Sequence, residues 1–127
     1  MIEVGAKPSG NHLFTAERRV ALAREALEDL PGARVDVVPG LLADYCREAG
    51  ATAVVKGLRS GTDLDAEVPM ALLNRDLGAP ETVFLVAAPA HAHVSSSLVK
   101  DVARHGGDVS GLVPAGVLAA LTEALGA

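Results

Sequence analysis

Two cations lie close together in residues 56–63, where Lys56 and Arg59 flank Gly57. A glycine lets a ligand approach the backbone closely. An arginine guanidinium can fork onto phosphate oxygens, and a lysine supplies a mobile point charge. These residue types suit phosphate binding, although a polar turn with surface cations explains them equally well. Glu67 lies one turn into the helix that follows and could face the same pocket, but a solvent-facing carboxylate is the simpler interpretation.

A second candidate anion site is the serine run Ser95, Ser96 and Ser97, which follows the most apolar strand and opens a helix. The free N–H groups and the dipole at a helix N-terminus favour an anion there. Serine is also an ordinary helix cap, so a structural role explains the run as well. If both segments lie at one edge of a sheet, a di- or triphosphate site becomes plausible, although no Gly-rich loop of the Walker type is present.

Other reactive side chains give weaker signals. His91-Ala92-His93 has a spacing that could chelate a metal ion, but exposed loop histidines are the simpler interpretation, and we predict no metal site. No Ser/His/Asp or Cys/His triad can be assembled, so the spacing indicates no catalytic residue. Cys46, the one cysteine, is expected in the core and cannot form an internal disulfide. With no signal peptide evident, this favours a reducing cytoplasm.

Strands and helices alternate in the segments that must position these residues. Strands are expected at residues 1–6, 34–38, 53–55 and 82–87. Helices are expected at about 16–29, 41–49, 63–77, from the Ser95–Ser97 run to Gly106, and 114–125. Thr15 and Asp63 are the expected caps of the first and third helices, and Pro69 should kink the third. The last helix begins with Pro114 at a tolerated first-turn position.

This alternation predicts an α/β fold with a Rossmann-like, doubly wound parallel sheet in three α/β/α layers. The most apolar segment, 82–87, is apolar on both faces, which is typical of a parallel strand covered by helices on both sides. Ligands in such sheets bind beyond the carboxyl ends of the strands. The loops to inspect are therefore 7–14, 39–42, 56–63 and 88–97.

Composition limits the function classes. The 127 residues suit a single domain, 1–127, and half of them are hydrophobic, which argues against disorder. Sixteen acidic and eleven basic residues give a net charge of −5, so no general attraction to nucleic acid or to an anionic membrane is expected. The longest apolar runs are too short to span a membrane.

Three stretches together resemble one enzyme family. FTAERRV at 14–20 resembles an F-T-x-x-E-R-V helix start. VKGLRSGTD at 55–63, with Glu67 and Asn74 after it, resembles G-L-R-x-x-x-D-x-E-x-E…N. VSSSLVKDVA at 94–103, followed by Gly-Asp-Val at 107–109, resembles an I-S-S-S/T signature and its continuation. The combination is similar to phosphopantetheine adenylyltransferase, of the nucleotidylyltransferase superfamily, and runs from about Val4 to Leu121.

The resemblance implies an enzyme that transfers the adenylyl group of ATP to 4′-phosphopantetheine, without a covalent enzyme intermediate. It implies Mg²⁺ with ATP and a homohexameric assembly. The implied ATP-binding residues are Gly57, Leu58, Arg59, Glu67, His91, Ala92, His93, Val94, Ser95, Ser96 and Ser97, with Arg59 on the phosphates. The implied phosphopantetheine contacts are Leu42 and Lys56, together with Gly10 at the position of a family lysine, for which nearby Lys7 can partly substitute.

The sequence departs from the family pattern in several places. The family opens with a strand and a G-x-F-D-P-x-x-x-G-H loop, whose histidine stabilises the transition state, whereas this sequence begins within the family's second strand. We therefore expect an N-terminally incomplete chain that lacks about 30 residues, one βα unit, and whose own activity is in doubt. The missing strand belongs in the middle of the family's sheet, so its loss would leave two edges unpaired. His91 replaces an aromatic residue, and Pro69 interrupts a family helix.

Two alternative functions remain open. The chain could be a degenerate homologue that binds ligand, or assembles with a full-length subunit, without catalysis. It could also be another nucleotidylyltransferase of the same superfamily, acting on nicotinamide mononucleotide or glycerol phosphate. The Gly57-Leu58-Arg59 stretch with Asp63 and Glu67 argues against this second alternative.

Overall fold

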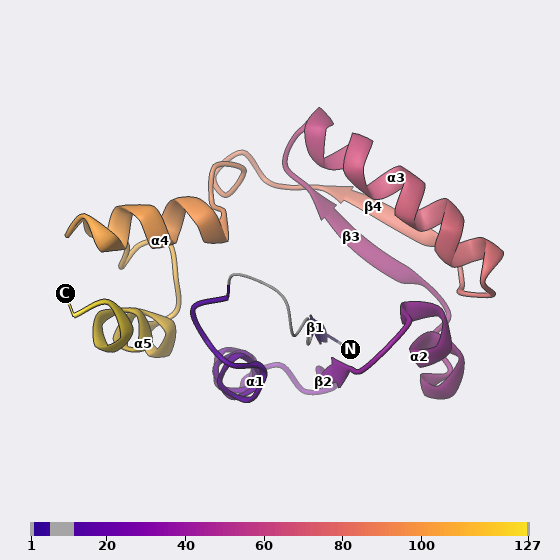
Figure 1. Cartoon of the computed structure of the whole chain (residues 1–127), viewed down its shortest axis with the longest axis horizontal. Coiled ribbons are helices and arrows are strands. Elements are labelled where there is room, and N and C mark those ends of the chain that lie inside the picture. Colours follow the sequence, from indigo (N-terminus) through magenta and orange to yellow (C-terminus); the bar gives the residue numbers. More distant parts are fainter. Residues whose placement is uncertain (1, 6–11, 127) are drawn as a thin grey trace. The chain divides into compact units, whose positions relative to one another are not determined.

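The computed structural model describes residues 2–5 and 12–126, and in these the strands and helices alternate as the sequence predicts (Figure 1). The elements are β1 (Ile2–Gly5), α1 (Ala16–Ala26), β2 (Val35–Val38), α2 (Leu42–Ala49), β3 (Val54–Leu58), α3 (Gly61–Asp76), β4 (Thr82–Val86), α4 (Ser96–Arg104) and α5 (Ala115–Leu125).

The four strands of the described residues pair in parallel, two by two. β1 pairs with β2, and β3 pairs with β4, so the described strands form two two-stranded sheets. The chain correspondingly divides into two compact units, one of residues 1–39 with 94–127 and the other of residues 40–93. The α/β class and the parallel pairing are confirmed. The described strands do not join into a single four-stranded sheet.

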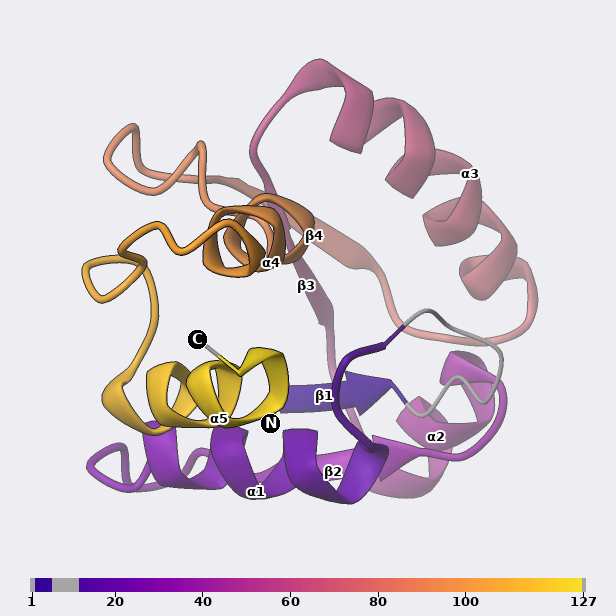
Figure 2. The same cartoon turned by 60° about the vertical axis from the view of Figure 1, so that its left-hand side comes forward.

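In the first unit, α1 packs on β2, and α4 packs on α5 (Figure 2). Val20 of α1 and Val35 of β2 are buried against each other, and Arg24 donates a hydrogen bond from Nη2 to the Val35 carbonyl at 3.1 Å. A second cluster is built on Val99 of α4 and Leu121 of α5. These clusters are aliphatic, as the composition indicates, and they fix the N-terminal ends of α1 and α4 in one unit.

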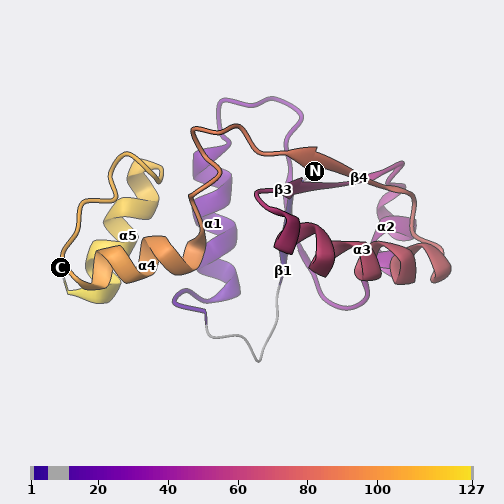
Figure 3. The ribbon, with the colours of Figure 1, turned by 90° about the horizontal axis from the view of Figure 1, so that it is seen from above.

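In the second unit, α3 lies along the β3–β4 sheet (Figure 3). The pairing register runs from Val54 opposite Thr82 to Leu58 opposite Val86. Lys56 lies on the face that meets α3, so by the alternation of a strand Val55 lies on the other face. Val55 is 61% exposed and its neighbour Val83 is 47% exposed. Within this unit, α3 therefore covers the face of the sheet that carries Lys56.

β3 is longer than expected, which changes the nature of the candidate loop. The prediction that 56–63 is a loop is wrong, because Lys56, Gly57 and Leu58 belong to β3 and pair with β4. Leu58 is buried, and its carbonyl accepts a hydrogen bond from the backbone N–H of Ala87 at 2.7 Å. Only Arg59 and Ser60 separate this strand from α3. This two-residue connection is therefore too short to adopt many conformations.

The helix ends agree with the sequence at some positions and differ at others. Thr15 caps α1 and Ser95 caps α4, as expected. Asp63 does not cap α3; Ser60 does, because its hydroxyl accepts the N–H of Asp63. Pro114 is the N-cap of α5 rather than its first helical residue. α1 ends at Ala26, and α3 runs through Pro69 without a break. No helix in the described part of the chain is long and apolar enough to cross a membrane.

Candidate functional site

Three polar contacts hold the connection between β3 and α3, and two of them involve Arg59. The Ser60 hydroxyl accepts a hydrogen bond from the Asp63 N–H at 3.3 Å. The Asp63 carboxylate in turn accepts the Arg59 backbone N–H at 2.9 Å and lies 3.3 Å from Arg59 Nε. Two ends of one residue are thus tied to one carboxylate at the start of a helix, where negative charge is favourable. The Arg59 side chain is still 42% exposed, so an anion can reach it.

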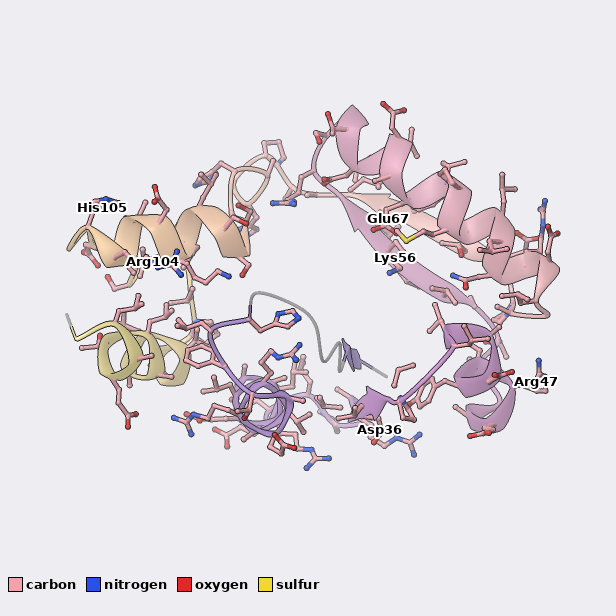
Figure 4. The ribbon with its side chains drawn as sticks, viewed as in Figure 1. Asp36, Arg47, Lys56, Glu67, Arg104 and His105 are labelled. Atoms are coloured by element: carbon pink, nitrogen blue, oxygen red, sulfur yellow. The ribbon has the colours of Figure 1, made fainter. Side chains whose placement is uncertain are left out.

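Lys56 and Glu67 face each other between β3 and α3 (Figure 4). The Lys56 Nζ lies 3.7 Å from Glu67 Oε2, and the two side chains are 37% and 25% exposed. The interpretation of Glu67 as a solvent-facing carboxylate is wrong, because it points from α3 toward the sheet. Both side chains thus lie between the sheet and α3, in the same unit as Arg59.

A cavity of about 290 Å³ lies at the N-terminus of α4 in the other unit. Ser95, the N-cap, accepts the N–H of Leu98 at 3.3 Å, which fixes the first turn of the helix. Val94, Ser95 and Ser96 line the cavity, and Ser97 is not among the lining residues. Apolar walls come from α4, from α5 and from the segments that precede α1, α4 and α5. The predicted serine site therefore borders a half-open cavity that is lined by both polar and apolar residues.

Sequence reasoning missed three basic residues that line this cavity: His12, Arg19 and Lys100. Arg19 lies on α1 and Lys100 on α4, far apart in the sequence. Both had a signal, because Arg19 falls within the 14–20 stretch and Lys100 within the 94–103 stretch that carry the resemblance. Spacing alone gave no reason to place them together.

The remaining predicted residues lie elsewhere. Leu42 is the first residue of α2, in the unit of Lys56. His91, Ala92 and His93 form a turn after β4, where the His91 N–H donates to the Ala88 carbonyl at 2.9 Å. Gly10 and Lys7 lie outside the described residues. The structure therefore brings together Lys56, Arg59 and Glu67 in one unit, and Val94 to Ser96 in the other.

Two further features concern electrostatics. Within the residues that the structure describes, no three His, Cys, Asp or Glu side chains gather as a metal-binding group. Asp108 lies in the 107–109 stretch and accepts the Ser110 backbone N–H at 2.9 Å. This hydrogen bond, with a second from the Ser110 side chain, holds the pKa of the Asp108 carboxyl below its ordinary value. The turn after α4 is thus fixed by an ionised side chain.

Comparison with known proteins gives the family. No family model matches the chain. A phosphopantetheine adenylyltransferase of Micrococcus luteus is 47% identical over 122 residues, which are 95% of this chain and 78% of the relative. That of Kocuria rhizophila is 48% identical over 97% of this chain and 80% of its own length. The chain belongs to the phosphopantetheine adenylyltransferase family. A third member, from Frankia casuarinae, is 51% identical over 89% of this chain and 72% of its own length.

Membership in the phosphopantetheine adenylyltransferase family confirms the resemblance seen in the sequence. Both units carry stretches on which that resemblance rests. Arg59 and Glu67 come from the stretch that begins at Val55, and Ser95 and Ser96 come from the one that begins at Val94.

Proposed function

We propose that this protein transfers the adenylyl group of ATP to 4′-phosphopantetheine, forming dephospho-CoA and pyrophosphate. The observation that carries the proposal is the identity of 47% and 48% to two phosphopantetheine adenylyltransferases over nearly the whole chain. In the reaction, a phosphate oxygen of phosphopantetheine attacks the α-phosphorus of ATP. The bond from that phosphorus to the β-phosphate bridging oxygen breaks, and pyrophosphate leaves with the electron pair.

Arg59 is the residue best placed to bind phosphate in the unit of residues 40–93. Its backbone and side chain are both held by Asp63, so little conformational freedom remains to be lost when ligand binds. Catalysis in such a transfer consists of positioning and charge stabilisation, which fixed cations supply. Gly57, Leu58 and Glu67 are the proposed companions of Arg59 at ATP.

Lys56 and Leu42 are the proposed contacts of phosphopantetheine. The carboxylate of Glu67 opposite Lys56 limits where the ammonium group of the lysine can lie. Glu67 thus links the proposed ATP contacts to the proposed phosphopantetheine contacts. The family resemblance also assigns ATP contacts to His91, Ala92 and His93, and to Val94 and the three serines. Mg²⁺ would enter with ATP and neutralise part of the phosphate charge.

A homo-oligomer is the proposed assembly, and a hexamer is the form that the family resemblance implies. On α3, Glu67 and Asn74 are half-buried, whereas Leu72 and Leu73 are 48% and 61% exposed. An exposed apolar helix face is typical of an interface. Light scattering after size exclusion tests this, with a multimer expected and a smaller species for Leu73→Glu. A monomeric mass for the unaltered protein would contradict it.

The test of the proposed reaction is the joint measurement of dephospho-CoA and pyrophosphate from ATP, phosphopantetheine and Mg²⁺. Equal amounts of both products are expected, and neither should form when phosphopantetheine is left out. If calorimetry shows that both substrates bind but no product forms, the protein is a ligand-binding homologue without catalysis. Adenylylation of nicotinamide mononucleotide or glycerol phosphate in place of phosphopantetheine would assign a different nucleotidylyltransferase.

A further inference from the structure

The half-buried residues of α3 are mostly polar. Four residues of this helix are half-buried, and they recur at the spacing of one helix face: Asp63, Glu67, Ala71 and Asn74. Leu72 and Leu73 are exposed instead. A helix that packs on a sheet ordinarily turns its apolar stripe toward the sheet, so this arrangement is the reverse of the usual one. Packing therefore gives no reason for the Glu67 carboxylate to lie between α3 and the sheet.

The ion pair that Glu67 forms with Lys56 is a loose one. The Lys56 Nζ and Glu67 Oε2 atoms lie 3.7 Å apart (Figure 4). A charge-assisted hydrogen bond is shorter, at about 2.7–2.9 Å. Phe84 of β4 is the cross-strand neighbour of Lys56 and projects from the same face of the sheet, so the pair has an apolar neighbour. The two charges attract each other while partly removed from water, yet a competing charge can separate them.

The two members of this ion pair belong to different substrates in the proposed function. Lys56 is the proposed contact of phosphopantetheine, and its ammonium group can donate to the oxygens of a phosphate monoester. Glu67 is a proposed contact of ATP, and an ionised carboxylate only accepts hydrogen bonds, such as those from the hydroxyl or amino groups of a nucleoside. Each substrate therefore competes with the ion pair for the group that it binds.

We propose that the Lys56–Glu67 ion pair couples the binding of the two substrates. The inference rests on the proposed function, which assigns the members of the pair to different ligands. A phosphate that binds Lys56 draws the ammonium group away from Glu67 and leaves the carboxylate available to the nucleoside. The free energy of separating the pair then opposes only the first substrate to bind. By thermodynamic linkage, the pair makes each substrate raise the affinity for the other by the same factor.

The test measures a coupling factor, the ratio of the dissociation constants of phosphopantetheine in the absence and in the presence of saturating nucleotide. Calorimetry uses α,β-methylene ATP with Mg²⁺, because a carbon atom in place of the bridging oxygen prevents adenylyl transfer. Glu67→Gln keeps the size of the side chain and removes its charge. The control is Arg75→Gln, which removes another ion pair of α3, that of Arg75 Nη1 with Glu81 Oε1 at 3.4 Å. Circular dichroism checks that both variants are folded.

The coupling factor of the unaltered protein should be about fivefold higher than that of Glu67→Gln. The two anionic ligands repel each other in both proteins alike, so this comparison isolates the ion pair. Glu67→Gln should also bind phosphopantetheine alone about fivefold more tightly than the unaltered protein does, because no carboxylate competes for Lys56. A merely structural role of Glu67 would weaken that binding instead. Arg75→Gln should keep both values within about twofold of the unaltered protein.

The inference is overturned if folded Glu67→Gln has the coupling factor of the unaltered protein, or if it binds phosphopantetheine alone no more tightly. If the unaltered protein still forms dephospho-CoA from ATP and phosphopantetheine in that case, the proposed function stands without the coupling. If either ligand fails to bind the unaltered protein, the proposed function fails, and the inference fails with it.

Discussion

Removal of the Asp63 carboxylate is expected to loosen the turn between β3 and α3. In Asp63→Ala the Arg59 N–H loses its acceptor at 2.9 Å, and Arg59 Nε loses a carboxylate at 3.3 Å. A hydrogen bond to a charged group contributes about 1.5–3 kcal/mol, and an acidic residue in a first helical turn about 0.3–1 kcal/mol. The Asp63 side chain is 26% exposed and that of Arg59 is 42% exposed, so solvent reduces both contributions. We expect a loss of about 2 kcal/mol in the free energy of unfolding.

Asp63→Asn separates the two roles of this carboxylate. The amide oxygen still accepts the Arg59 N–H, whereas the charge beside the guanidinium and the helix N-terminus is lost. Asp63→Asn should therefore lower the free energy of unfolding by roughly 1 kcal/mol, about half of the loss expected for Asp63→Ala. The control is Asp65→Ala, an exposed acid of the same helix, for which a change under about 0.5 kcal/mol is expected.

Urea unfolding followed by circular dichroism measures these differences, provided that all variants show the same slope of free energy against urea. Asp63→Ala should also weaken ATP binding, but by less than removal of Arg59 itself, since the guanidinium would be displaced rather than deleted. The reasoning is refuted if Asp63→Ala is as stable as Asp65→Ala. Equal losses in Asp63→Ala and Asp63→Asn would refute the role assigned to the backbone acceptor.

Three further predictions concern Arg59, Asp108 and Gly107. Arg59→Ala should weaken ATP binding by about 1.5–3 kcal/mol in calorimetry, and unchanged affinity would remove Arg59 from the phosphate site. Asp108→Asn should lower stability to urea above the ordinary carboxyl pKa of 3.8. The pKa of Asp108 is lower in the folded protein than in the unfolded chain, so this loss of stability should disappear as the pH falls through the folded-state pKa. A loss that persists at acid pH would contradict the role of the Ser110 hydrogen bonds. Gly107→Ala should cost about 1–3 kcal/mol, because the added Cβ would clash with the Val102 side chain and lie 3.1 Å from its carbonyl oxygen; an unchanged melting temperature would refute this.

The features that the sequence predicted well are local ones. The Thr15 and Ser95 caps follow from a hydroxyl three residues before the N–H that it accepts. The order and type of the elements follow from apolar runs and from the glycines and prolines that separate them. Cys46 is buried in α2, as its residue type suggested. The family could be inferred because its three stretches are distinctive in combination.

The features that the sequence did not predict depend on contacts between distant segments. Lys56 and Gly57 have the composition of a loop, and they become strand because β4 offers a parallel partner. Glu67 turns toward the sheet because Lys56 faces it across the β3–α3 layer. Arg19 and Lys100 share a cavity only because α1 and α4 belong to one unit. None of these contacts leaves a periodic pattern in the chain.

The most direct test of the central claim is a competition for the acceptor of the adenylyl group. The protein is given ATP and Mg²⁺ with equal concentrations of phosphopantetheine, nicotinamide mononucleotide and glycerol phosphate, and the products are identified by mass spectrometry. The account predicts dephospho-CoA as the adenylylated product, with an equal amount of pyrophosphate. A mixture in which another acceptor is adenylylated instead, or in which no dephospho-CoA forms, would contradict it.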